Sequence, residues 1–366
     1  MLGLMRSLGA IFRAPGEPLE VVDLDIEAPR AGEVLVRMAA VGICGSDLHV
    51  VKGEWPRPVP MVLGHEGVGT VEELGEGVTE VAVGDRVVIS WAPACGQCGP
   101  CRLGRPTACE RLRAAIAAGT TLDGTTRISL RGETVYRMTA TGCLAEYVVV
   151  QANAALPLGE GIAIDEAALL GCAALTGVGA VRNASRLGPG QSALVVGAGG
   201  VGQFVVQGAR MADAAEIVCV DPNPCRLERA RALGATKVGH PDDLPSLIED
   251  GVDVAFDAVG LPDTSALALA HTRATGQCVL VGMPPAGARL DLDPAEFTNR
   301  EKTLTGSVYG SQDPAVALPL LLDDVREGRL ELRSMLGEHF PLEAADEAFR
   351  VSAAGSPGRV IVTPGP

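Results

Sequence analysis

The spacing of hydrophobic residues changes near position 165 of this 366-residue chain. Before that point, short apolar and β-branched runs are bounded by Pro and Gly, which is typical of strands, and helical periodicity is weak. We therefore expect a partly open barrel or a strongly bent sheet in the N-terminal part. The runs that carry this prediction are 19–22, 33–38, 67–75, 85–89 and 144–150.

After position 165 an Ala-rich helical stretch, 164–184, leads into apolar strands that alternate with amphipathic helices. Such alternation predicts an α/β fold with a doubly wound parallel sheet. We expect a first domain at 1–173, a second at 174–307, and a return of 308–366 to the first. The predicted strands of the second domain are 193–196, 216–221, 252–257 and 277–281, and its predicted helices include 201–211 and 226–233.

Composition narrows the class of protein. Hydrophobic residues make up 47% of the chain and aromatic residues only 3%, so the core must be built from Val, Leu, Ile and Ala, as in sheets covered by helices. The net charge of −15 disfavours nucleic acid or an anionic membrane as a partner. No apolar run reaches the ~18 residues needed to span a bilayer, and residues 1–13 lack the features of a secretory signal, so we expect a cytoplasmic protein.

Residues 197–202, Gly-Ala-Gly-Gly-Val-Gly, fit the pattern G-x-G-x-x-G between a predicted strand and a predicted helix. In that context the glycines allow a tight turn, a close approach to a pyrophosphate and close helix–strand packing, and the helix N-terminus favours phosphate. Asp221 ends the next strand, where it can accept hydrogen bonds from the adenosine ribose and repel a 2′-phosphate. The sequence therefore predicts NAD rather than NADP, and the alternative is a tight turn that binds no ligand.

Four of the ten cysteines lie close together, at Cys95, Cys98, Cys101 and Cys109. In a long chain such a cluster indicates a metal site before disulfides. Four thiolates close a tetrahedral zinc site with no open position, which predicts a structural zinc. An iron–sulfur cluster is the main alternative, because spacings of two residues suit it as well.

Three further residues could hold a second metal ion. Cys44, His65 and Cys172 offer two thiols and an imidazole, and three such ligands plus one open position are how a catalytic zinc is held. Taken singly, a cysteine such as Cys44 or Cys172 is more often a small buried residue, and a histidine such as His65 is more often structural.

In chain order, these motifs resemble those of the zinc-dependent alcohol dehydrogenases of the medium-chain dehydrogenase/reductase superfamily. The resemblance implies a GroES-like bent β-barrel catalytic domain and a Rossmann domain, and it covers nearly the whole chain. The matching segments are Gly42-Ile43-Cys44-Gly45-Ser46-Asp47, Gly64-His65-Glu66-Gly67-Val68-Gly69, Val83-Gly84-Asp85-Arg86-Val87, the cysteine loop, Gly171-Cys172, the dinucleotide loop and Arg359-Val360.

The resemblance implies two zinc ions per chain, with Cys44, His65 and Cys172 as ligands of the catalytic one. Glu66 would lie just behind that metal, and Asp47 would orient the imidazole of His65.

The resemblance also implies a mechanism. The zinc lowers the pKa of an alcohol, whose carbon then passes hydride to the nicotinamide. Ser46 and His49 stand where family members conduct the alcohol's proton to the surface. A solvated loop histidine is the alternative interpretation of His49.

Other implied roles concern the cofactor and the substrate. Trp55, Trp91 and Met283 fall where the family lines its substrate pocket, although all three could be ordinary core residues. Gly45 stands where several members carry a basic residue on the pyrophosphate, which predicts weaker cofactor binding here. The implied cofactor contacts are Gly197, Gly199, Gly200, Val201, Gly202, Asp221, Arg226, Thr176 and Arg359, the last of which could also be a surface arginine.

The expected function is NAD-dependent oxidation of primary or aromatic alcohols to aldehydes, with a small-molecule substrate.

Segment 113–140 is polar and Gly/Thr-rich, and we expect an inserted surface excursion there. It resembles an insertion of dimeric family members and of glutathione-dependent formaldehyde dehydrogenases, which favours a homodimer over a tetramer. Arg113 lies where the formaldehyde enzymes recognise glutathione, but Trp55 replaces an acidic residue that they carry. The alternatives are formaldehyde oxidation with glutathione or mycothiol, and a non-enzymatic NAD-binding relative.

Overall fold

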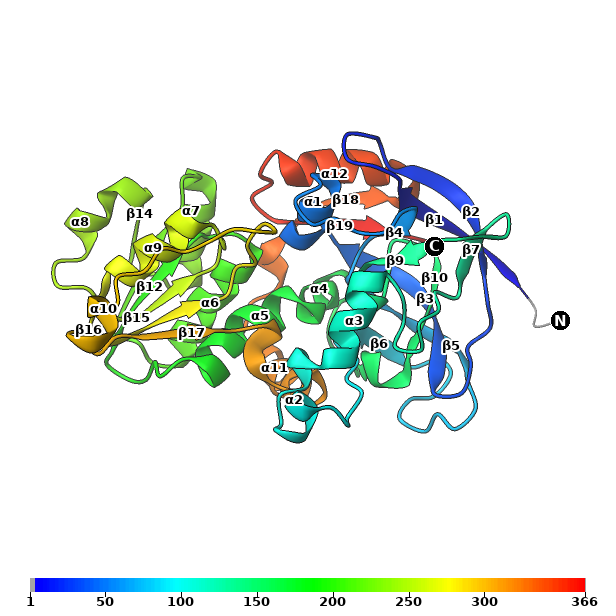
Figure 1. Cartoon of the computed structure of the whole chain (residues 1–366), viewed down its shortest axis with the longest axis horizontal. Coiled ribbons are helices and arrows are strands. Elements are labelled where there is room, and N and C mark those ends of the chain that lie inside the picture. The colour runs from blue at the N-terminus through cyan, green and yellow to red at the C-terminus, as the bar shows by residue number, and fades with distance from the viewer. Residues whose placement is uncertain (1–3, 366) are drawn as a thin grey trace. The chain divides into compact units, whose positions relative to one another are not determined.

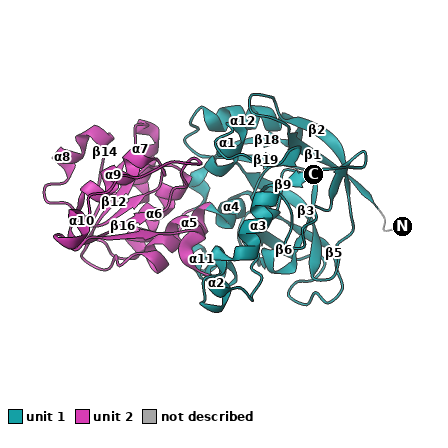
Figure 2. Cartoon of the chain, in the orientation of Figure 1, with its two compact units in different colours: residues 1–172, 313–326, 332–366 teal, residues 173–312, 327–331 magenta. Residues whose placement is uncertain are grey.

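The computed structural model describes residues 4–365, so residues 1–3 and 366, the outer ends of the expected domains, lie outside it. The chain divides into two compact units, which Figure 2 colours separately. Unit 1 comprises Met1–Cys172, Asp313–Arg326 and Leu332–Pro366, and unit 2 comprises Ala173–Gln312 and Glu327–Glu331. The C-terminal part of the chain thus belongs mainly to the first unit.

Unit 1 is built on two sheets whose strands curve into a nearly closed barrel, which confirms the expected fold of this part (Figure 1). The strands are β1 (Met5–Phe12), β2 (Glu20–Ile26), β3 (Glu33–Gly42), β4 (Met61–Val62), β5 (Glu66–Leu74), β6 (Arg86–Ile89), β7 (Ile128–Leu130), β8 (Glu133–Thr134), β9 (Tyr136–Arg137), β10 (Tyr147–Gln151), β11 (Ala155–Pro157), β18 (Leu336–Pro341) and β19 (Arg359–Thr363). The helices are α1 (Gly45–Val51), α2 (Gly99–Arg102), α3 (Glu110–Ala118), α4 (Ile164–Ala168), α11 (Pro314–Arg326) and α12 (Ala345–Ala353).

Strand β3 is the centre of the barrel. It pairs with β5 along one edge and with β10 and β19 along the other, so its backbone is bonded on both sides. Register shifts in the β3–β5 pairing, between Leu35 and Val36 and between Met38 and Ala40, are the irregularities that bend a sheet. The end of β3 leads directly into α1, and this junction carries part of the candidate site.

Segment 113–140 is more deeply integrated than expected from its polarity, and the prediction of a surface excursion is wrong in this respect. Its first residues belong to α3, and β7, β8 and β9 extend the sheet of order β8-β7-β2-β1-β4-β9. The side chains of Arg127 and Arg137 are buried. A polar sequence does not reveal that its side chains are buried when those side chains are paired with partners inside the protein.

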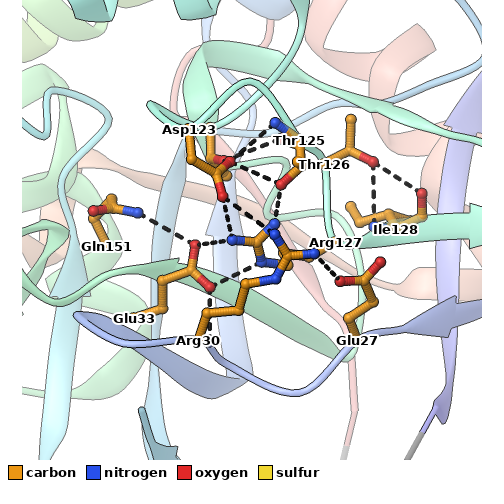
Figure 3. A network of polar contacts seen from close by, with 10 residues as sticks. Glu27, Arg30, Glu33, Asp123, Thr125, Thr126, Arg127, Ile128 and Gln151 are labelled. Atoms are coloured by element: carbon orange, nitrogen blue, oxygen red, sulfur yellow. Dashed lines mark hydrogen bonds and ion pairs between the residues drawn. The ribbon is translucent and has the colours of Figure 1, made fainter. Parts of the chain in front are cut away.

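Arg127 anchors this segment to the barrel through the network drawn in Figure 3. Its guanidinium meets Glu33 in a bidentate pair, with Nη2–Oε1 at 2.8 Å and Nε–Oε2 at 2.9 Å. The two side chains are only 1% and 2% exposed. Gln151 donates to the same carboxylate, and Asp123 accepts from the arginine. Both charges are buried, so removing either side chain would leave the other as an uncompensated charge inside the protein, which is strongly destabilising.

Unit 2 is a parallel sheet of order β14-β13-β12-β15-β16-β17, which confirms the predicted doubly wound fold. Its strands are β12 (Ser192–Val196), β13 (Glu216–Val220), β14 (Lys237–Gly239), β15 (Val252–Asp257), β16 (Thr272–Leu280) and β17 (Thr303–Gly306). Its helices are α5 (Ala173–Gly179), α6 (Gly200–Met211), α7 (Pro224–Leu233), α8 (Leu244–Leu247), α9 (Pro262–Ala270) and α10 (Ala295–Thr298). The strand order reverses beside β12, and ligands of such sheets bind at that switch point.

The helical stretch predicted at 164–184 is broken. After α4 comes a 3₁₀ turn, Leu169–Gly171, and Cys172 has φ −148°, outside the helical region, before α5 begins. In the described part of the chain no single helix is long and apolar enough to span a membrane. Only the pair Ile164–Gly171 and Ala173–Ala184, bent by 51° and mostly buried, meets the criteria of length and composition together.

Replacing Arg127 by Met should lower the free energy of unfolding of unit 1 by about 3–5 kcal/mol, because Glu33 would remain as a buried, unpaired carboxylate. Urea unfolding followed by circular dichroism measures this loss. Arg13→Met is the matched control, because the Arg13–Glu20 pair is 38% and 49% exposed and should contribute less than about 1 kcal/mol. Equal losses in the two variants would contradict the argument.

Candidate active site and metal centres

Four side chains that can bind a metal ion meet in the interior of unit 1. Ligand atoms of Cys44, His65, Glu66 and Cys172 all lie within 4.8 Å of one another, and all four residues are buried. Cys44 is the N-cap of α1, His65 and Glu66 stand at the start of β5, and Cys172 occupies the break after α4. The fold therefore brings together the three predicted zinc ligands and adds a carboxylate.

Asp47 connects two of these segments. One carboxylate oxygen accepts the backbone N–H of Cys44 at 2.9 Å, and the other accepts the N–H of Gly64 at 3.0 Å. The second oxygen also lies 3.3 Å from Nδ1 of His65. With Nδ1 engaged in this way, Nε2 of His65 is the nitrogen left for a metal. The structure thus places Asp47 in contact with the imidazole that it is expected to orient.

Glu66 lies in the same interior and faces Arg359. Nε of Arg359 is 2.9 Å from one carboxylate oxygen, although the two groups are not aligned for a hydrogen bond. Burial raises the pKa of Glu66 to about 8. A side chain at Gly42 would collide with this carboxylate, which explains the glycine. Buried oxygens without hydrogen bonds are groups that a cation would stabilise.

The donor types of the cluster suit a cation, and the ligand side chains shift one another's pKa values. A hydrogen bond from Cys172 lowers the pKa of Cys44 well below its usual value and raises that of Cys172. Burial acts to lower the pKa of His65, but Asp47 raises it well above its usual value. Thiolate, imidazole and carboxylate ligands at these distances fit zinc.

Helix α1 carries both residues of the predicted proton relay. Ser46 and His49 are three positions apart, so they lie on the same face of the helix. The hydroxyl of Ser46 is 4.0 Å from the sulfur of Cys44. Nδ1 of His49 contacts the carboxylate of Glu54, and its ring stacks on Trp55 with a centroid distance of 4.6 Å. The contact with Glu54 was not anticipated from the sequence.

The four-cysteine loop forms a second cluster, in which the four sulfur atoms lie within 4.8 Å of one another. The Sγ–Sγ distances of 3.4 Å for Cys98–Cys101 and 3.8 Å for Cys98–Cys109 are far longer than a disulfide bond, and all ten cysteines are free. Backbone N–H groups lower the pKa of Cys95 to about 6. The donor set is that of a closed, structural zinc site.

The dinucleotide loop of unit 2 joins β12 to α6. Gly197 has φ +93°, and a Cβ at Gly202 would collide with the Gly197 carbonyl oxygen, so both positions require glycine. A Cβ at Gly199 would meet nothing within 4 Å, which leaves room for a phosphate at the start of the helix. The loop is braced by Asp221, whose carboxylate accepts the N–H of Ala198 at 2.8 Å.

The other predicted cofactor residues are distributed over both units. Arg226 is 3.9 Å from the Asp221 carboxylate, and Val201 lies in the first turn of α6. Thr176 is buried on α5. Arg359 belongs to unit 1, where it also donates to the carbonyl of Ile43 at 3.0 Å. Cofactor contacts for these residues stay predictions.

The three predicted pocket residues have different surroundings. Trp55 stacks on His49, which ties it to the predicted relay. Trp91 follows β6 and is partly buried in unit 1, whereas Met283 follows β16 in unit 2 and is 50% exposed.

One support of the site was missed by the sequence reasoning. Thr141 donates its hydroxyl proton to the carbonyl of Gly64 at 3.3 Å, and the fully buried Arg137 donates to the carbonyl of Thr141 at 3.0 Å. These bonds hold the backbone next to His65. No pattern in the polar segment 113–140 signals this contact, because it depends on how the segment folds over β4.

The comparisons with known proteins agree with this geometry. Residues 30–160 match the alcohol dehydrogenase GroES-like domain, and residues 200–323 match the zinc-binding dehydrogenase domain. The chain is 35% identical over 369 residues to S-(hydroxymethyl)glutathione dehydrogenase of Escherichia coli O1:K1, covering 98% of this chain and 100% of the relative.

Solved structures are similar over nearly the whole chain. Benzyl alcohol dehydrogenase from Acinetobacter calcoaceticus superimposes with a TM-score of 0.92 at 29% identity, covering 99% of this chain and 100% of that one. A zinc-binding dehydrogenase from Sinorhizobium meliloti 1021, bound to NADP, has a TM-score of 0.82 at 26% identity, covering 98% and 100%.

The purified protein should contain two zinc ions per chain, one in each cluster, as measured by plasma mass spectrometry. Cys172→Ser should leave about one zinc, because it removes a thiolate from the first cluster only. Cys98→Ser should also leave about one zinc ion per chain. Its melting temperature should be lower, because the four-cysteine loop would lose the zinc ion that links its ligands. Two zinc ions retained in Cys172→Ser would contradict the assignment of this ligand.

Proposed function

Because the chain belongs to the zinc-dependent alcohol dehydrogenases of the medium-chain dehydrogenase/reductase superfamily, we propose that it oxidises primary or aromatic alcohols to aldehydes with NAD. The observation that carries the proposal is the buried cluster of Cys44, His65 and Cys172, with the hydroxyl of Ser46 4.0 Å from the first thiol. The enzyme uses zinc and a nicotinamide dinucleotide. The choice of alcohol and of NAD over NADP is the proposed part.

Zinc bound by the three ligands supplies Lewis-acid polarisation of a substrate oxygen. The chain's own residues supply the rest. Asp47 holds the imidazole of His65 in one orientation. Ser46 accepts the proton of the alcohol, and His49, on the same face of α1, passes it to solvent. Glu66 lies buried beside the ligands and faces Arg359.

NAD is proposed on the basis of the loop and the carboxylate beside it. Asp221 uses two of its acceptor sites on backbone N–H groups, of Ala198 and Asn223, and a carboxylate has about four. The remaining sites can accept from the ribose hydroxyls, and the negative charge opposes a 2′-phosphate. The proposed cofactor contacts also include Arg226, Thr176, Val201 and Arg359.

A second candidate function is oxidation of the adduct of formaldehyde with a thiol such as glutathione or mycothiol. The relative from Escherichia coli with 35% identity, an S-(hydroxymethyl)glutathione dehydrogenase, favours it. Arg113 on α3 is the proposed contact for the thiol's carboxylate. Trp55 argues for the first candidate, because an aromatic ring suits a benzylic alcohol better than a charged peptide.

We also propose that the protein forms a homodimer, with a tetramer as the alternative. The proposal rests on segment 113–140.

The deciding experiment is reduction of NAD across aliphatic alcohols, benzylic alcohols, and formaldehyde with and without added thiol. We expect turnover of primary and benzylic alcohols without any thiol, and with NAD rather than NADP. Turnover of formaldehyde only in the presence of glutathione or mycothiol, with slow benzylic oxidation, would establish the second candidate instead. Turnover with NADP but not with NAD would overturn the argument from Asp221.

Gly45→Arg should tighten binding of NADH by about 10-fold, because a charge-assisted contact to the pyrophosphate would be gained. The position accepts a side chain, since a Cβ there would meet nothing within 4 Å and φ is not positive. Fluorescence titration measures the dissociation constant, and Gly45→Ala controls for the loss of glycine alone. An unchanged dissociation constant in Gly45→Arg would show that this position does not contact the pyrophosphate.

A further inference from the structure

A short loop after α1 closes around His49. Gly53, with φ +74°, reverses the chain so that the next two residues return toward the helix. The N–H groups of Glu54 and Trp55 both donate to the carbonyl of His49, at 2.9 and 3.2 Å. The same two residues then contact the imidazole. Backbone and side chain of His49 are therefore held by one loop of a few residues.

The imidazole is held along its edge and across its face. The carboxylate of Glu54 contacts Nδ1, and the Trp55 ring stacks on the imidazole at 4.6 Å with 17° between the planes. The guanidinium carbon of Arg57 lies 5.9 Å from the centroid of the Trp55 ring. Within residues 4–365, Glu54 is the only acidic side chain in contact with the imidazole.

This arrangement selects one tautomer of the neutral His49 ring. An Nδ1 that faces a carboxylate carries the proton, so Nε2 is the basic nitrogen of the neutral ring. The imidazole is 21% exposed and Glu54 35% exposed, so the pair is only partly screened by water. An arriving proton at Nε2 would produce an imidazolium directly beside a negative charge.

We propose that Glu54 is a positioning residue for proton release. It keeps the ring of His49 in the Nδ1–H form, with Nε2 ready to receive the proton of the alcohol. The imidazolium then releases one proton to bulk water, which restores the neutral ring. This inference rests on the proposed function, because it assumes that His49 ends the relay.

A purely structural role is the competing explanation, in which Glu54 only shapes the loop. The two explanations differ in whether the effect of replacing Glu54 on turnover requires the imidazole of His49. A positioning residue loses its effect on turnover once the imidazole is gone, whereas a structural residue keeps it.

The test compares Glu54→Gln, His49→Gln and the double variant. Glu54→Gln should lower kcat by roughly 10-fold, part of the 10²–10⁴-fold that a positioned acid–base group contributes, with KM for NAD unchanged. In the His49→Gln background the same substitution should have no further effect. Asp165→Asn is the matched control, because it breaks an exposed His–carboxylate pair of unit 1, with His339 at 3.3 Å, and should leave kcat unchanged.

A readout independent of activity is nuclear magnetic resonance of the protein labelled with ¹⁵N-histidine. His49, identified by its loss in His49→Gln, should be protonated at Nδ1 in the wild type and lose that preference in Glu54→Gln. An Nε2–H form in the wild type would overturn the inference, and so would equal losses of kcat in the two backgrounds. If the wild type oxidises no alcohol, the proposed function fails, and the nitrogen signals still decide whether Glu54 sets the form of the ring.

Discussion

The carboxylate of Asp47 accepts the backbone N–H groups of Cys44 and Gly64 and contacts the ring of His65. These groups lie on either side of a connection that includes α1 and the loop after it. One buried anion thus sets the distance between two metal ligands and the orientation of the imidazole. A buried carboxyl group is costly unless polar groups satisfy its oxygens, and here two backbone N–H groups donate to them. The start of α1, and with it the direction of the proposed relay, follows from this arrangement.

The second requirement of the site is a balance of buried charges. The thiol of Cys44, whose pKa is lowered, brings negative charge into the interior, and Arg359 is a buried cation that faces Glu66 beside it. Arg359 begins β19, which pairs with β18 and, two residues further on, with β3. The interior charge is therefore balanced only when the C-terminal strand joins the barrel, which couples completion of the fold to formation of the site.

The loop after α1 links the relay to the substrate. Trp55 stacks on His49 and is a proposed wall of the substrate pocket, so the same ring would contact the reacting alcohol and the group that takes its proton. Both the aromatic residue and the acidic residue of this loop contact the imidazole of His49. Under the proposed function, the ring of Trp55 would offer no polar group to a charged thiol adduct. Family membership alone does not distinguish the two candidate functions.

The sequence by itself determined the elements that depend on local spacing. The dinucleotide loop, the four-cysteine cluster and the alternating strands and helices of unit 2 were predictable because neighbouring residues carry the whole pattern. The three zinc ligands needed the family resemblance, since Cys172 lies far from the other two. Only the tertiary structure decided that Glu54 contacts His49, that Arg359 faces Glu66, and that Thr141 supports Gly64. The polar segment 113–140 was misjudged for the same reason. A polar side chain looks alike in sequence whether water or a distant partner satisfies it, and only the folded chain shows which partner is present.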